Sequence, residues 1–227
     1  MPRSAPSFAN RRVVVTAGGT REPIDVVRYI GNRSSGRMGN AIALAAVDRG
    51  AAVTLITTVA PAHDERVTVV RVDTADEMDA AVRRALPGAD VLLMAAAVAD
   101  YRVADVARRK LKKQASLTLD LVPTVDILGG LAGDPARHGV LVVGFAAETD
   151  DIEANARRKL TGKQLDLVVL NDIARSGIGM GTEDNEVSVF DSAGLVAHIS
   201  RRPKPLVAGA LLDIVAGRLG AAARVRR

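Results

Sequence analysis

The sequence contains no cysteine and no tryptophan, and only three phenylalanines and two tyrosines occur among its 227 residues. Without cysteine the chain has no disulfide, no thiolate zinc site and no cysteine nucleophile. Because aromatic side chains are so few, Ala, Val, Leu and Ile must fill the core, as is typical of parallel α/β sheets and their covering helices. We expect the three histidines, His63, His138 and His198, on the surface rather than as metal ligands or bases.

Long apolar runs are missing as well. No segment approaches the length of a membrane-spanning helix, and the N-terminus lacks the apolar stretch of a signal peptide. We therefore expect a cytoplasmic protein without membrane contact. The formal net charge of +5 suits either a nucleic-acid binder or an enzyme for anionic, phosphorylated small molecules. Single-strand and RNA binders usually place aromatic platforms among their basic residues. No such motif occurs here, so we favour small anionic substrates.

Strand and helix patterns alternate through most of the chain. Apolar runs typical of buried strands occur at residues 12–17, 52–57, 67–72, 89–98, 140–146 and 165–170. Segments with helical spacing lie at residues 38–49, 75–86 and 152–162. This alternation predicts an α/β fold with a Rossmann-like, doubly wound and largely parallel sheet. We expect a single domain at residues 11–219, a flexible leader or linker remnant at 1–10 and a basic tail at 220–227.

Two segments interrupt this alternation. Residues 101–122 hold a basic cluster and then an alternating stretch, which predicts an extra strand or a projecting arm. Residues 186–190 and 195–199 flank the turn-forming sequence Asp-Ser-Ala-Gly, which indicates a C-terminal β-hairpin. A final helix is predicted over about residues 204–219, with prolines at its start.

The first predicted strand and the helix after it carry a candidate anion site. Gly18 belongs to a Gly-Gly pair that suggests close backbone approach to a ligand, but the dinucleotide fingerprint G-x-G-x-x-G is absent. Residues 31–36 have the glycine spacing of a P-loop without its Lys-Ser/Thr. Residues 34–36 (Ser-Ser-Gly) directly precede a helix, whose N-terminal N–H groups can bind an anion; an ordinary serine N-cap is the alternative. The polar residues around this start favour the anion site: Arg28, Asn32, Arg33 and Arg37.

Other predicted strand ends also carry small or polar residues. Residues 95–100 close a strand with small side chains and end on Asp100, a carboxylate suited to a ribose hydroxyl or a metal. Lys110 opens a Lys-Leu-Lys-Lys run, which is either a solvated charged run or a clamp for phosphate charge. Lys159 and Lys163 are four residues apart and share a helix face. Because ligands bind at the carboxyl ends of parallel strands, these residues predict one site for a phosphorylated molecule.

Five motifs together resemble the phosphopantothenate–cysteine ligase family, in one order and over about residues 12–219. They are residues 16–25 (TAGGTREPID), 27–39 (VRYIGNRSSGRMG), 96–101 (AAVADY), 110–113 (KLKK) and 144–149 (GFAAET). The resemblance implies that the chain joins 4′-phosphopantothenate to L-cysteine in coenzyme A synthesis. CTP would convert the substrate carboxylate to an acyl-cytidylate and release pyrophosphate. The cysteine amine would then displace CMP, so no enzyme nucleophile is needed.

The resemblance assigns roles to individual residues. Asn32 and Lys110 are the expected catalytic residues, Asn32 for conversion of the acyl-cytidylate and Lys110 for its formation. Arg28, Asn32 and Ala96 are expected to bind phosphopantothenate. The expected nucleotide contacts are Gly18, Ser34, Ser35, Gly36, Ala96, Asp100, Lys110, Val125, Asp126, Ile127, Leu128, Phe145, Lys159 and Lys163. Mg²⁺ would be held mainly by the triphosphate, with Asp100 as a further candidate ligand.

The resemblance also implies a homodimer in which the partner helps to build the substrate site. Family members are often fused behind a flavin-dependent phosphopantothenoylcysteine decarboxylase. We expect no flavin in this chain, which would be a stand-alone ligase or an excised C-terminal domain, and no nucleic-acid partner. Thr124-Val125 stands where Asn-Pro is usual in the family. Two alternatives remain: a non-catalytic Rossmann-like nucleotide-binding module, and an NAD(P)-dependent reductase, which the missing fingerprint and the missing Tyr-x-x-x-Lys pair disfavour.

Overall fold

The structure is a computed structural model that describes residues 8–61, 64–148, 151–172 and 181–225. Most of the predicted leader, His63 and the last two residues of the predicted tail therefore lie outside the described residues. His138 and His198 are both exposed, as predicted. No helix in the described part of the chain is long and apolar enough to cross a membrane.

Eight strands form the central sheet, in the order β12-β11-β10-β9-β6-β1-β4-β5. Its parallel part comprises β1 (Arg12–Ala17), β4 (Ala52–Thr57), β5 (Val67–Arg71), β6 (Val91–Met94), β9 (Leu141–Glu148) and β10 (Leu167–Asp172). Numbered along the chain, these six follow the order 3-2-1-4-5-6 of a Rossmann fold. The antiparallel hairpin of β11 (Asp184–Asp191) and β12 (Gly194–Pro203) extends one edge. The predicted α/β sheet and the predicted hairpin are thus confirmed.

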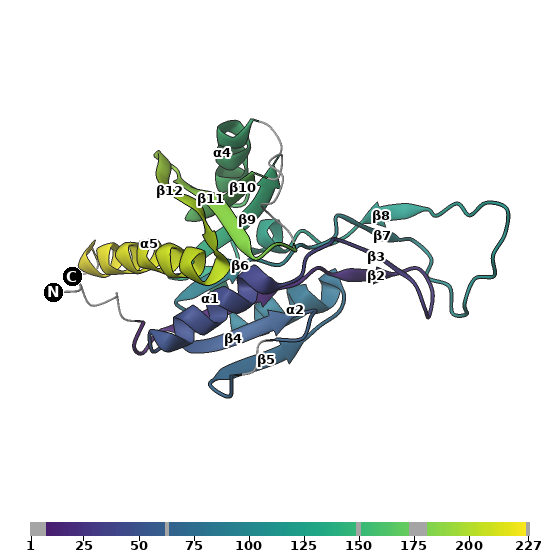
Figure 1. The fold of residues 1–227 in the computed structure, drawn as a ribbon, viewed down its shortest axis with the longest axis horizontal. Helices are drawn as coiled ribbons and strands as arrows, with labels where there is room; N and C mark the ends of the chain where they lie inside the picture. Colours follow the sequence, from purple (N-terminus) through teal and green to yellow (C-terminus); the bar gives the residue numbers. More distant parts are fainter. Residues whose placement is uncertain (1–7, 62–63, 149–150, 173–180, 226–227) are drawn as a thin grey trace.

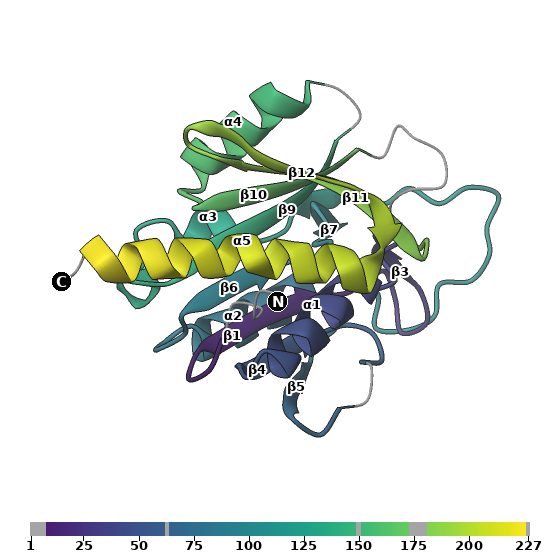
Figure 2. The ribbon, with the colours of Figure 1, turned by 60° about the vertical axis from the view of Figure 1, so that its left-hand side comes forward.

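Helices cover both faces of the sheet (Figures 1 and 2). One face carries α1 (Arg37–Asp48) and α5 (Lys204–Val225); the other carries α2 (Ala75–Ala85), the short α3 (Ile127–Leu131) and α4 (Ile152–Gly162). A 3₁₀ turn, η1, spans Pro135–Arg137. Alternate β1 side chains enter different cores, since Val13 and Val15 pack with α1 and α5 whereas Val14 packs with α2. Burial on both faces explains why β1 reads as a continuous apolar run.

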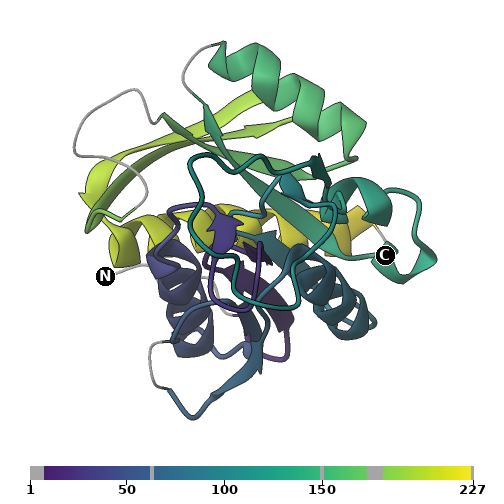
Figure 3. The same ribbon diagram turned by 90° about the vertical axis from the view of Figure 1, so that its right-hand side faces the viewer.

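An arm projects from the carboxyl edge of the sheet (Figure 1), and Figure 3 views the molecule from the end of this arm. It consists of the hairpin β2 (Arg21–Pro23) and β3 (Tyr29–Gly31), and of β7 (Tyr101–Val103) paired with β8 (Leu121–Pro123). The predicted arm is confirmed. The strand suggested by the alternating pattern of residues 116–122 is mostly wrong, because only residues 121–123 pair with the three-residue β7.

Several element bounds differ from the prediction. The strand predicted over 89–98 ends at Met94, because the chain then leaves the sheet to pair with the loop after β1. There Ala97 donates to Gly18 O at 2.8 Å, and Thr20 donates to Ala97 O at 3.2 Å. Small side chains permit this close approach of two loops. The strand predicted from residue 165 starts at Leu167, and the last helix continues to Val225 rather than ending near residue 219.

Candidate functional site

A cavity of about 500 Å³ opens at the carboxyl ends of β6, β9 and β10, beside the start of α1. This is the sheet edge at which Rossmann-like folds bind ligands, and the volume is that of a small-molecule site. Thirteen of the predicted site residues line it: Asn32, Ser34, Ser35, Gly36, Ala96, Asp100, Val125, Asp126, Ile127, Leu128, Phe145, Lys159 and Lys163. The fold therefore brings together residues that are more than a hundred positions apart.

The start of α1 forms one wall of the cavity. Its N-cap is Gly36 with a φ of 72°, and no side chain caps the helix. The alternative of an ordinary cap by Ser34 or Ser35 is therefore wrong. A Cβ at Gly36 would lie 2.4 Å from Val59 Cγ2 and 3.1 Å from the backbone nitrogen of Gly18, so only glycine fits here. An uncapped helix start presents backbone N–H groups and the positive end of the helix dipole to the cavity, which favours an anion.

The loop of residues 95–100 forms the floor and is fixed by side chains from other segments. The buried hydroxyls of Thr16 and Thr20 accept hydrogen bonds from Ala96 N (3.0 Å) and Ala99 N (2.9 Å). Asn32 Nδ2 donates to Val98 O at 3.1 Å. Neither threonine is predicted from the sequence, because nothing in the pattern of β1 distinguishes a hydroxyl that holds a distant loop from one that fills the core.

The far wall carries an ion pair. Lys163 Nζ lies 2.9 Å from Asp126 Oδ1, and the same carboxylate caps α3 by accepting from Gly129 N at 3.0 Å. Burial by itself would raise the pKa of Asp126, but these two hydrogen bonds and the charge of Lys163 together outweigh burial and hold the pKa below its ordinary value. Lys159 lines the same wall. The lysines of this wall can therefore bind a phosphate, and the Asp126 carboxylate can accept a hydrogen bond from a ligand.

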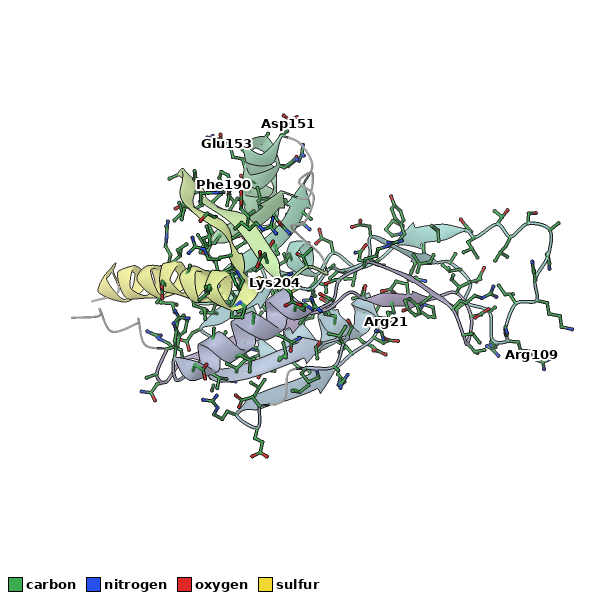
Figure 4. All side chains as sticks on the ribbon, in the orientation of Figure 1. Arg21, Arg109, Asp151, Glu153, Phe190 and Lys204 are labelled. Atoms are coloured by element: carbon green, nitrogen blue, oxygen red, sulfur yellow. The ribbon has the colours of Figure 1, made fainter. Side chains whose placement is uncertain are left out.

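Three predicted residues do not line the cavity. Gly18 lies behind the start of α1, where its φ is 90° and an added Cβ would collide with the Thr58 side chain, so glycine is required. Arg28 is on the arm, paired with Asp25 at 2.5 Å and donating to Leu111 O at 2.9 Å. Lys110 is exposed on the same arm; Figure 4 labels its neighbour Arg109 far from the body of the molecule.

The described residues contain no group of three or more His, Cys, Asp or Glu side chains that could hold a metal ion. Asp100 lines the cavity as an exposed carboxylate. One carboxylate suits a Mg²⁺ ion that takes most of its oxygen ligands from a bound phosphate chain.

Fifteen further residues of the cavity wall are absent from the predicted nucleotide and substrate contacts, among them Arg37, Asn171, Asn185 and Lys204. Lys204 opens α5 directly after the β-hairpin. The sequence predicts it only as the start of a helix, and no local signal indicates that the hairpin returns it to the sheet edge.

These features define a Rossmann-like α/β protein with a cavity at the carboxyl edge of its sheet, lined in part by cationic side chains. The family model described as "DNA/pantothenate metabolism flavoprotein C-terminal domain" matches residues 8–219. The chain therefore belongs to this family. Two curated relatives, each named "Coenzyme A biosynthesis bifunctional protein CoaBC", come from Mycobacterium bovis and Escherichia coli. They are 43% identical over 221 and 215 residues, which cover 92% and 91% of this chain.

The chain spans about half the length of these curated relatives, 52% in both cases. A crystal structure of the C-terminal domain of a CoaBC protein is 35% identical with a TM-score of 0.79, and the match covers 96% of this chain and all of that one. The DNA/pantothenate metabolism flavoprotein from Streptococcus pneumoniae matches at 21% identity with a TM-score of 0.77, over 92% of this chain and 99% of that one. The latter likeness concerns the fold alone.

Proposed function

We propose that the chain is a CTP-dependent ligase that joins 4′-phosphopantothenate to L-cysteine through an acyl-cytidylate. The observation that carries this proposal is the convergence of thirteen predicted site residues on one cavity beside an uncapped helix start. Membership of a family whose curated relatives are coenzyme A biosynthesis proteins supports it. We also propose that the protein is cytoplasmic.

In this proposal the nucleotide lies along the cavity. Residues 125–128 and Phe145 hold the base, and the phosphates face the start of α1, Lys159 and Lys163. Mg²⁺ would neutralise phosphate charge and favour attack on the α-phosphorus. Asn32 is held by Val98 O and Ala97 O at 3.1 and 3.4 Å, at the lip of the cavity, where it can orient the acyl-cytidylate. The substrates supply both attacking groups, the carboxylate and then the amine, so the enzyme need only position them and stabilise charge.

The arm supports a proposed homodimer. Seven of its large apolar side chains are exposed: Val26, Val27, Tyr29, Tyr101, Val106, Leu117 and Leu121. Such a concentration marks an interaction surface, and we assign it to a second copy of the chain. Arg28 and Lys110 lie on the same arm, so they would reach a cavity through the dimer or through movement of the arm.

Val27→Asp should give a monomer in sedimentation velocity, whereas Leu195→Asp, an equally exposed position on the hairpin, should not. A dimer in both variants contradicts the assignment.

The decisive experiment measures pyrophosphate without cysteine. CTP and 4′-phosphopantothenate should release pyrophosphate, in an amount close to that of the enzyme, before the amino acid is added. Cysteine should then yield CMP and the amide product. ATP in place of CTP is the control for nucleotide choice. Turnover with ATP alone contradicts the cytidine assignment, and nucleotide binding without pyrophosphate release favours the non-catalytic module. Tight binding of NADPH with no response to CTP would favour the reductase.

A further inference from the structure

A second cationic cluster lies at the end of the cavity where α1, β11 and α5 meet. Lys204 is 5% exposed and lines the cavity together with Arg37 and Asn185. Figure 4 labels Lys204 at the first turn of α5, next to the hairpin. The nucleotide and phosphopantothenate contacts proposed above include none of these three side chains.

Backbone contacts fix both cations at this place. The Lys204 ammonium donates to Thr182 O, and the Lys204 backbone N–H donates to Glu183 O at 3.1 Å. Arg37 Nη1 donates to Gly181 O at 3.0 Å and pairs with Glu183 Oε1 at 2.7 Å. Both side chains therefore bond to residues 181–183, and both line the cavity. A rigid pair of cations is suited to one small anion.

Asn185 provides an independent observation. Its side chain is 4% exposed, its Oδ1 has no hydrogen-bond partner among the described residues, and its Nδ2 contacts only the weak acceptor Met38 Sδ at 3.8 Å. Buried amides almost always have partners. The Nδ2 group, held only by a weak sulfur acceptor, can donate to a ligand carboxylate, and Oδ1 can accept from a ligand N–H group such as the amine of an amino acid.

The electrostatic environment of Lys204 also favours an anion. Burial lowers the pKa of Lys204, and the charge of Arg37 lowers it further, while Glu183 and Asp184 act in the opposite direction. An anion bound between the two cations would screen their repulsion and favour the charged ammonium.

We propose that Lys204, Arg37 and Asn185 form the subsite for the α-carboxylate of the amino-acid substrate. This inference rests on the proposed ligase function. In the proposed function the triphosphate is assigned to the N–H groups at the start of α1 and to Lys159 and Lys163, and the single phosphate of phosphopantothenate is assigned to Arg28 of the arm. The remaining anion of the reaction is the amino-acid carboxylate, and a subsite for it inside the shared cavity brings the amine to the activated acyl group.

The test compares Lys204→Met with Arg202→Met, a partly exposed control that removes the same charge from the end of β12. Lys204→Met should release pyrophosphate from CTP and phosphopantothenate as the wild type does, which also verifies its folding. Its KM for L-cysteine should rise about 10- to 100-fold, the effect of losing one charge-assisted hydrogen bond. Arg202→Met should change neither quantity. Arg37→Gln, on a half-exposed side chain, should raise the same KM by a smaller factor.

Cysteamine lacks the carboxylate of cysteine, so it shows whether the substitution acts through carboxylate binding or through another step of the reaction. Lys204→Met and the wild type should use cysteamine equally well. A variant that loses pyrophosphate release assigns Lys204 to a nucleotide or pantothenate phosphate and overturns the inference. So does an unchanged KM for L-cysteine, or an equal loss with cysteamine. If the wild type itself releases no pyrophosphate, the proposed function fails. The subsite is then judged by the NMR signal of the Lys204 ε-methylene, which must shift with L-cysteine and not with cysteamine.

Discussion

Replacement of Gly39 by alanine tests how tightly α1 packs on the sheet. Gly39 lies in the first turn of α1, where alanine would normally stabilise a helix by about 1 kcal/mol relative to glycine. A Cβ at this position would lie 2.6 Å from Ala17 Cβ and 2.6 Å from Thr16 O, both on the central strand β1. Ordinary contacts begin at 3.4 Å, so α1 would have to move outward by roughly 1 Å.

The magnitude follows from these two opposing effects. Overpacking against backbone in a close-packed core costs about 1–3 kcal/mol, and contact with the centre of the sheet places Gly39→Ala toward the upper end. After subtraction of the helical gain, we expect a net loss of about 2 kcal/mol, or about 4–8 °C in Tm for a chain of this size. The outward shift should also displace the uncapped N-terminus of α1 and weaken nucleotide binding.

The assay is thermal or urea unfolding, with Gly217→Ala as the matched control. Gly217 is exposed on α5, and a Cβ added there would meet nothing within 4 Å beyond the backbone of its own helix and its chain neighbours. That variant should therefore gain up to about 1 kcal/mol. The two substitutions are chemically identical and should have opposite signs. If Gly39→Ala were as stable as Gly217→Ala, the close contact of α1 with β1 would be refuted.

Three further outcomes are expected. Asn32→Asp should release pyrophosphate but accumulate acyl-cytidylate, seen by mass spectrometry; a normal rate of product formation excludes the role. Lys110→Gln should slow pyrophosphate release at saturating CTP, and an unchanged rate contradicts it. Asp25→Asn should speed proteolysis of the arm at neutral pH, because Asp25 accepts from Arg28 and from the Leu111 N–H beside Lys110. These bonds, with Arg28 the larger cause, hold the pKa of Asp25 well below its ordinary 3.8. The stabilisation is therefore complete above that pH and is lost as the pH falls toward the lowered pKa; equal proteolysis rates for variant and wild type at pH 7 would contradict it.

Much of the fold could be predicted from local pattern. The helix at residues 152–162 and the strands at 12–17 and 52–57 have the predicted bounds, because buried parallel strands are continuous apolar runs and a helix repeats its apolar positions every three to four residues. The predicted strand bounds are wrong where hydrogen bonding to a distant segment determines the end of the strand. Residues 95–98 are as apolar as a strand but leave the sheet to pair with Gly18 and Thr20.

The sequence by itself determined the residue types of the site, since glycine at a helix start, small residues at a strand end and paired lysines each have local chemical reasons. The tertiary structure decided which of them meet. It placed Asp126 against Lys163, used Thr16 and Thr20 to hold the cavity floor, and kept Arg28 and Lys110 on the arm. It also brought Lys204 to the cavity. The physical reason is that charge and burial depend on neighbours distant in sequence, and only the assembled sheet brings those neighbours together.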